Sequence, residues 1–154
     1  MHRGDLRARE HAEASLREMV AHLNVIDAGI AAIGESTGAD VSAAARDFLS
    51  RLELLAFLAA RVRVSDVPRV TDGLEELVLA AQLQPRQHED VGDVLRQGVD
   101  VLLLLTHDAM RRLHGHPAAD LGGAVDALLE RIDRLISARD RKGAPAHNVD
   151  GAII

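Results

Sequence analysis

The sequence predicts an all-α protein, an antiparallel four-helix bundle with an additional fifth helix. Apolar residues recur at spacings of three and four along five stretches, and the alternating pattern of a half-buried strand is absent. Short segments rich in Gly, Pro or Ser separate these stretches, as expected of helices joined by short loops. The chain has 154 residues, the length of one domain. We expect the bundle at residues 1–140 and a flexible tail without periodicity at residues 141–154.

The first two helices are predicted by long apolar stripes. The first helix is expected from about Asp5 to Gly34, where glycine acts as a stop signal, and the second begins near a cap at Asp40 or Ser42. The stripe of the first helix is Leu16, Met19, Val20, Leu23, Ile26, Ile30 and Ile33. The stripe of the second is Val41, Ala45, Phe48, Leu52, Leu55, Ala59 and Val62.

Three shorter segments complete the predicted bundle. The third helix has Pro68 in its first turn, where proline is tolerated, and ends at Pro85. The fourth opens with His88 and the acidic residues Glu89, Asp90 and Asp93, which suit the positive end of a helix dipole. The apolar stripe of the third helix is Val67, Val70, Leu74, Leu77, Val78 and Ala81. The fourth has Val91, Val94, Leu95, Val99, Leu102, Thr106, Ala109, Met110 and Leu113. After a turn at His114–Pro117, the fifth has Leu121, Val125, Leu128, Leu129, Ile132, Leu135 and Ile136.

The composition excludes several classes of function. Phe48 and Phe57 are the only aromatic residues, which removes the stacking platforms of single-strand nucleic-acid binders. The net charge of −6 lacks the basic footprint of a DNA-binding protein, so we expect no nucleic-acid partner. Cysteine is absent, which excludes disulfides and thiolate chemistry. No apolar run is long enough for a membrane span or a signal peptide, so we expect no membrane association and a cytoplasmic location.

The histidines do not form a recognisable metal site. His107 and His114 lie two turns apart on one helix face and His116 follows in the loop, but no carboxylate or thiol completes a tetrahedron. We therefore expect no metal and no cofactor. His22 lies at the edge of the first stripe, where it is either a partly buried structural residue or a phosphoacceptor.

The second to fourth helices resemble a histidine-containing phosphotransfer domain, in particular the N-terminal domain of chemotaxis histidine kinases. The residues that carry the resemblance are Phe48–Phe57, the turn Val64–Val70, the Leu74-Glu75 pair, and Glu89–Leu102 with its Asp93 and Asp100. The similar region extends from about Leu16 to Leu135. The resemblance implies a helical bundle that exchanges a phosphoryl group with a receiver domain.

The sequence departs from this family at the positions of the residues that carry out phosphotransfer. The phosphoacceptor histidine aligns at or beside Glu53, and the Lys-Gly pair of the family aligns at Ala56-Phe57. A carboxylate cannot form a phosphoramidate, and the chain's single lysine, Lys142, is near its end. The resemblance therefore implies a degenerate domain without phosphotransfer activity. Glu75 matches the family glutamate that hydrogen-bonds the phosphoacceptor.

The sequence also suggests what such a domain does. If the second and third helices are antiparallel, Glu53 and Glu75 lie close together, with Arg51 or Arg61 screening their repulsion. We expect a partner-binding surface of Arg51, Glu53, Leu54, Phe57 and Glu75. The expected function is a non-catalytic adaptor or inhibitor that binds a response-regulator receiver or a histidine kinase in bacterial two-component or chemotaxis signalling.

Two alternatives remain open. The segment from Arg17 to Val64 has the dimensions of a kinase dimerisation hairpin, in which His22 would be the acceptor of an active phosphotransferase. A structural protein that forms a homo-oligomer, such as a homodimer, is the other alternative, with apolar residues outside the stripes (Val25, Leu54, Phe57 and Leu104) forming the interface.

Overall fold

The computed structural model describes residues 3–35, 39–83 and 88–143, and these residues form five helices without strands. The helices are α1 (Arg3–Glu35), α2 (Ala39–Val62), α3 (Val67–Leu83), α4 (His88–Leu113) and α5 (Gly122–Gly143). The predicted all-α class is confirmed. Helix α5 continues three residues past Asp140, into the segment expected to be a tail, and residues 144–154 lie outside the described part.

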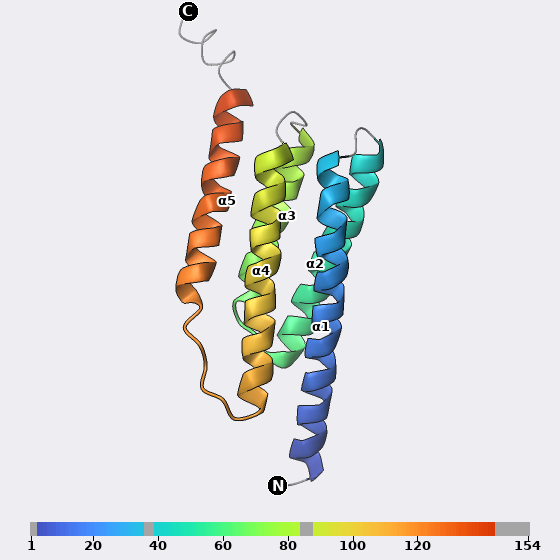
Figure 1. The fold of residues 1–154 in the computed structure, drawn as a ribbon, viewed down its shortest axis with the longest axis vertical. Coiled ribbons are helices and arrows are strands. Elements are labelled where there is room, and N and C mark those ends of the chain that lie inside the picture. Colours follow the sequence, from blue (N-terminus) through green and yellow to red (C-terminus); the bar gives the residue numbers. More distant parts are fainter. Residues whose placement is uncertain (1–2, 36–38, 84–87, 144–154) are drawn as a thin grey trace, which may run out of the picture.

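The first four helices form a ring of antiparallel neighbours. Helix α1 packs against α2 and α4, and α3 closes the ring by packing against the same two helices. Helix α5 lies outside this ring against α3 and α4, and the N-terminal end of α1 extends beyond its neighbours (Figure 1). The predicted four-helix bundle with an additional fifth helix is therefore confirmed.

One apolar core runs the length of the bundle. The predicted stripes face it, and their largest fully buried members include Leu23, Leu55, Leu77, Leu95 and Leu128, one from each helix. Each buried side chain of this kind contributes about 1.5–3 kcal/mol relative to an exposed one. The side chains of Val41, His88, Glu89 and Asp90, which were part of the sequence predictions, lie outside the described residues.

Two glycines allow the helices to approach closely. An ideal Cβ on Gly98 of α4 would lie 2.5 Å from Leu74 Cδ2 of α3. A Cβ on Gly73 of α3 would lie 2.9 Å from Leu129 Cδ2 of α5. Helix α3 is therefore held between α4 and α5 at contacts that leave no room for a side chain.

Two helices end in the same capping motif. At the end of α2, Arg63 has a φ of 59° and the Val64 amide donates to the Ala59 carbonyl oxygen over 3.0 Å. At the end of α4, Gly115 has a φ of 85° and the His116 amide donates to the Arg111 carbonyl oxygen over 3.1 Å. Both are Schellman motifs, in which a left-handed residue turns the chain away from the helix. The first one lies at the start of the short turn that joins α2 to α3.

None of the helices in the described ranges combines the length and the apolar character needed to cross a bilayer.

Candidate functional site

The residues predicted to bind a partner lie on two different sides of α2. Arg51 faces α1, where its Nη1 lies 3.1 Å from His22 Nδ1, and its Nε donates to Asp47 Oδ2 over 3.2 Å. Glu53 follows Arg51 by two residues, which is about 200° around a helix axis. Glu53 is therefore exposed on the α3 side of α2. Of the two arginines expected to screen Glu53 and Glu75, Arg51 does not face Glu53, because its guanidinium is held by His22 and Asp47 on the opposite side of the helix.

Glu75 lies on the side of α3 that faces α2. Gly73 contacts side chains of α5, and Glu75 lies about 200° around the helix from it, on the side away from α5. Glu53 precedes the last residue of α2 by nine residues, and Glu75 follows the first residue of α3 by eight. Because the two helices are antiparallel and joined by a short turn, this register brings both exposed carboxylates to the same height along the α2–α3 edge.

Phe57 lies one turn from Glu53 on the same side of α2. The residue is 60% exposed, the highest value among the large apolar residues that the structure describes. Arg61 lies over the ring, with its Cζ 5.9 Å from the ring centroid, which is a cation–π distance. Arg61 therefore covers part of Phe57, and no ion pair joins it to Glu53 or Glu75 among the described residues.

Leu54 does not belong to this exposed surface. It is half-buried and packs against the core, on the side of α2 that also carries Arg51. The predicted site thus separates into two parts. Glu53, Phe57 and Glu75 lie toward the α2–α3 edge, whereas Arg51 and Leu54 lie toward α1.

Three further residues of α3 extend the exposed part, and the sequence analysis did not select them. Asp72, Glu76 and Leu79 are exposed, and with Glu75 they follow the spacing of three and four that marks one helix face. We call the set Glu53, Phe57, Asp72, Glu75, Glu76 and Leu79 the α2–α3 acidic face. Within the described residues, none of its four carboxylates forms an ion pair or a side-chain hydrogen bond.

His22 is part of a polar chain between α1 and α2. A guanidinium has donors only, so Arg51 donates to Nδ1, and the proton of the neutral ring is then on Nε2. Nε2 lies 3.7 Å from Glu18 Oε1, and the side chain is only 20% exposed. A phosphoryl acceptor needs a free lone pair, and in this arrangement neither ring nitrogen has one. The geometry supports the structural interpretation of His22.

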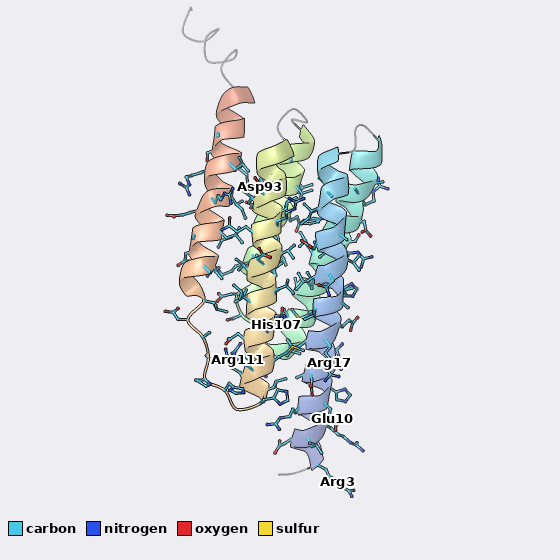
Figure 2. The ribbon with its side chains drawn as sticks, in the orientation of Figure 1. Arg3, Glu10, Arg17, Asp93, His107 and Arg111 are labelled. Carbon is cyan, nitrogen blue, oxygen red and sulfur yellow. The ribbon has the colours of Figure 1, made fainter. Side chains whose placement is uncertain are left out.

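The histidines near the C-terminal end of α4 do not converge. His114 Nε2 lies 3.7 Å from Glu13 Oε1, which also accepts from Arg17. His107 is exposed on α4, one turn from Arg111, as Figure 2 shows. Across the ranges that the structure describes, no group of three or more His, Asp or Glu residues is arranged to hold a metal ion.

A buried carboxylate, Asp108, holds the α4–α5 loop and was missed by the sequence analysis. Its side chain is 9% exposed, Oδ1 accepts from the Ala119 amide over 2.9 Å, and Oδ2 lies 3.1 Å from Arg112 Nε. It borders a cavity of about 280 Å³ that is also lined by Ser65, Asp66 and Asp120. Since both oxygens have partners, Asp108 acts as a structural anchor. The hydrogen bond between the Ala119 amide and Asp108 joins residues that are eleven apart in sequence, so the spacings of three and four within a helix could not predict it.

No family model, curated protein or solved structure matches this chain. The resemblance to a phosphotransfer domain therefore remains a prediction made from the residues quoted for it.

Proposed function

We propose that this chain is a non-catalytic, phosphotransfer-like bundle that binds a response-regulator receiver domain or a histidine kinase. It would act as an adaptor or inhibitor in two-component or chemotaxis signalling. The binding surface is the α2–α3 acidic face. The observation that supports this proposal best is the exposure of Phe57 beside Glu53, at the position where the resemblance aligns the phosphoacceptor.

Two properties of this face favour binding over catalysis. Glu53 is a carboxylate and cannot replace an imidazole as phosphoryl acceptor, and the described part of the acidic face has no lysine to neutralise phosphoryl oxygens. A largely exposed phenylalanine contributes little to the packing of its own bundle, and aromatic residues are enriched at protein–protein interfaces. The face thus has the composition of a docking site.

Calorimetric titration with a panel of receiver and kinase domains tests the proposal. We expect at least one partner to bind, and Phe57→Ala to weaken that binding by about tenfold or more. The matched control is Leu104→Ala, which truncates an exposed apolar residue on α4 and should leave binding unchanged. Absence of binding across the panel, or equal effects of the two substitutions, would contradict the proposal.

Incubation with a labelled phosphodonor separates this proposal from an active phosphotransferase. We expect no acid-labile phosphate on the wild-type protein, because the nitrogens of His22 are engaged as described above. Labelling that disappears in His22→Ala would support the kinase-hairpin alternative.

A structural homo-oligomer is the second candidate. Val25 on α1 and Leu104 on α4 are both about half exposed and lie outside the acidic face. Light scattering gives the molar mass of the protein in solution and so distinguishes the two candidates, because a monomer supports the adaptor. An oligomer that Val25→Ser or Leu104→Ser dissociates supports the structural protein.

A further inference from the structure

We infer that the α2–α3 acidic face recognises a basic amphipathic helix of its protein partner. This inference rests on the proposed docking face and adds the chemistry of what docks there. It is carried by the unpaired carboxylates of the face and by the positions of its two exposed apolar residues.

The carboxylates of this face are not balanced by ion pairs, whereas several other exposed carboxylates of the bundle are paired. Elsewhere Glu13 pairs with Arg17, Asp47 with Arg51, and Asp126 with Arg69. Glu53, Asp72, Glu75 and Glu76 have no such partner within the described residues.

The nearest basic residues form no ion pair with these carboxylates within the described residues. Arg69 is held by Asp66 and Asp126, and Arg61 lies over Phe57, where it adds one positive charge beside the four negative ones. Arg46 is exposed two turns before Glu53, about 10 Å along the axis of α2. Four like charges on one edge repel one another and attract a cationic surface, which also raises the rate of association.

The two apolar residues of the face, Phe57 and Leu79, are separated along the α2–α3 edge by a distance that can be derived from the helix register. Phe57 lies five residues before the end of α2, and Asp72 lies five residues after the start of α3, so the register places them at the same height. Leu79 is 45% exposed and lies seven residues beyond Asp72, which separates the two apolar side chains by about 10 Å along the edge. The Glu53 and Glu75 carboxylates lie between these two heights.

This arrangement matches the surface of a helix. Apolar residues at positions i and i+7 of a helix are also about 10 Å apart, and they share one side with residues at i+3 and i+4. A partner helix with apolar residues at i and i+7 and Lys or Arg beside them would cover Phe57 and Leu79 while its cations meet the carboxylates. Docking of an amphipathic helix through such anchors is a recurrent mode of recognition.

A fluorescent helical peptide of leucine and lysine, with leucines at spacings of three and four, is the probe. Its affinity for the full chain is measured by anisotropy at low and high salt, next to a leucine–glutamate peptide of the same pattern. Two quadruple variants are compared with the wild type. The face variant is Glu53→Gln, Asp72→Asn, Glu75→Gln and Glu76→Gln. The control variant is Asp93→Asn, Asp100→Asn, Glu130→Gln and Asp133→Asn, which neutralises four exposed carboxylates of α4 and α5.

Both quadruple variants change the net charge by the same amount, so a difference in their affinity for the peptide shows where on the protein the peptide binds. We expect the face variant to weaken binding about tenfold or more and the control variant to weaken it less than about twofold. Phe57→Ala should weaken binding further, whereas Leu104→Ala should not. Salt should weaken binding to the wild type, because the charges involved are exposed. Circular dichroism verifies that each variant remains helical.

Equal weakening by the two quadruple variants would overturn the inference, because binding would then follow net charge alone. Equal binding of the leucine–glutamate peptide would overturn it as well. A receiver or kinase that binds with no dependence on salt or on the face variant would contradict this inference and leave the proposed function standing. If peptide binding is weakened by the face variant and not by the control variant, but no receiver or kinase binds, this inference stands and the proposed function is contradicted.

Discussion

Arg51 of α2 donates a hydrogen bond to Nδ1 of His22 in α1, over a distance of 3.1 Å. This bond crosses the α1–α2 contact and has consequences on both helices. On α1 it occupies the nitrogen lone pair that His22 would need for nucleophilic attack with this nitrogen. On α2 it directs Arg51 away from Glu53, which leaves that carboxylate unscreened by its neighbour in sequence.

The tautomer of His22 tests this relationship. We expect the neutral ring to have its proton on Nε2 in the wild type, because Nδ1 accepts from Arg51. In Arg51→Ala the Nδ1–H tautomer should gain population. Long-range nitrogen–proton NMR spectra recorded at alkaline pH report the tautomer directly. A Nδ1–H tautomer in the wild type would contradict the assigned bond.

The close contact between α3 and α4 predicts opposite effects of two glycine substitutions in α4. Gly98→Ala should lower the free energy of unfolding by about 1–3 kcal/mol, because its Cβ would lie 2.5 Å from Leu74 Cδ2. Gly92→Ala meets nothing within 4 Å and should raise the free energy by about 0.5–1 kcal/mol through helix propensity. Chemical denaturation measures both. A stabilising Gly98→Ala would show that the helices are farther apart than described.

Removal of the loop anchor predicts a local and a global effect. Asp108→Ala should lower the free energy of unfolding by about 1–3 kcal/mol, because the Ala119 amide loses its acceptor, Arg112 loses its partner and the loop loses its anchor to α4. Asp100→Ala, an exposed site on the same helix, is the control and should change stability by less than about 0.5 kcal/mol. Hydrogen exchange of the Ala119 amide should accelerate only in the first variant. Unchanged exchange there would argue against the anchor.

The cap at the end of α2 predicts a stabilising substitution. Arg63 has a left-handed φ of 59°, which is unfavourable for a residue with a Cβ. Arg63→Gly should therefore raise the free energy of unfolding by about 0.5–1 kcal/mol. Arg61→Gly, two residues earlier in helical conformation, should lower it by a similar amount. Thermal unfolding of the two variants compares them, and a loss of stability in Arg63→Gly would mean that this turn favours the arginine.

Much of the fold was predictable from the sequence because it depends on local patterns. The stripe that includes Leu16 and Leu23, and the one that includes Leu52 and Leu55, determine which side of each helix is buried. The expected helix ends agree closely with the structure, since glycine and proline act on the backbone locally. The exception is the end of α5, which continues to Gly143 although the apolar stripe stops earlier.

The candidate site was predictable only in part. The exposure of Glu53, Phe57 and Glu75 follows from their positions outside the stripes. The sequence alone also determined that no histidine or lysine stands where the resemblance to a phosphotransfer domain would place them. The tertiary structure decided what these residues neighbour. It placed Arg51 against His22, buried half of Leu54, anchored a loop at Asp108, and brought Asp72, Glu76 and Leu79 to the edge that Glu53 occupies. Periodicity defines directions around one helix axis, whereas the pairing of side chains depends on how two helices are set against each other, and that is determined by turns and close contacts such as Gly98 with Leu74.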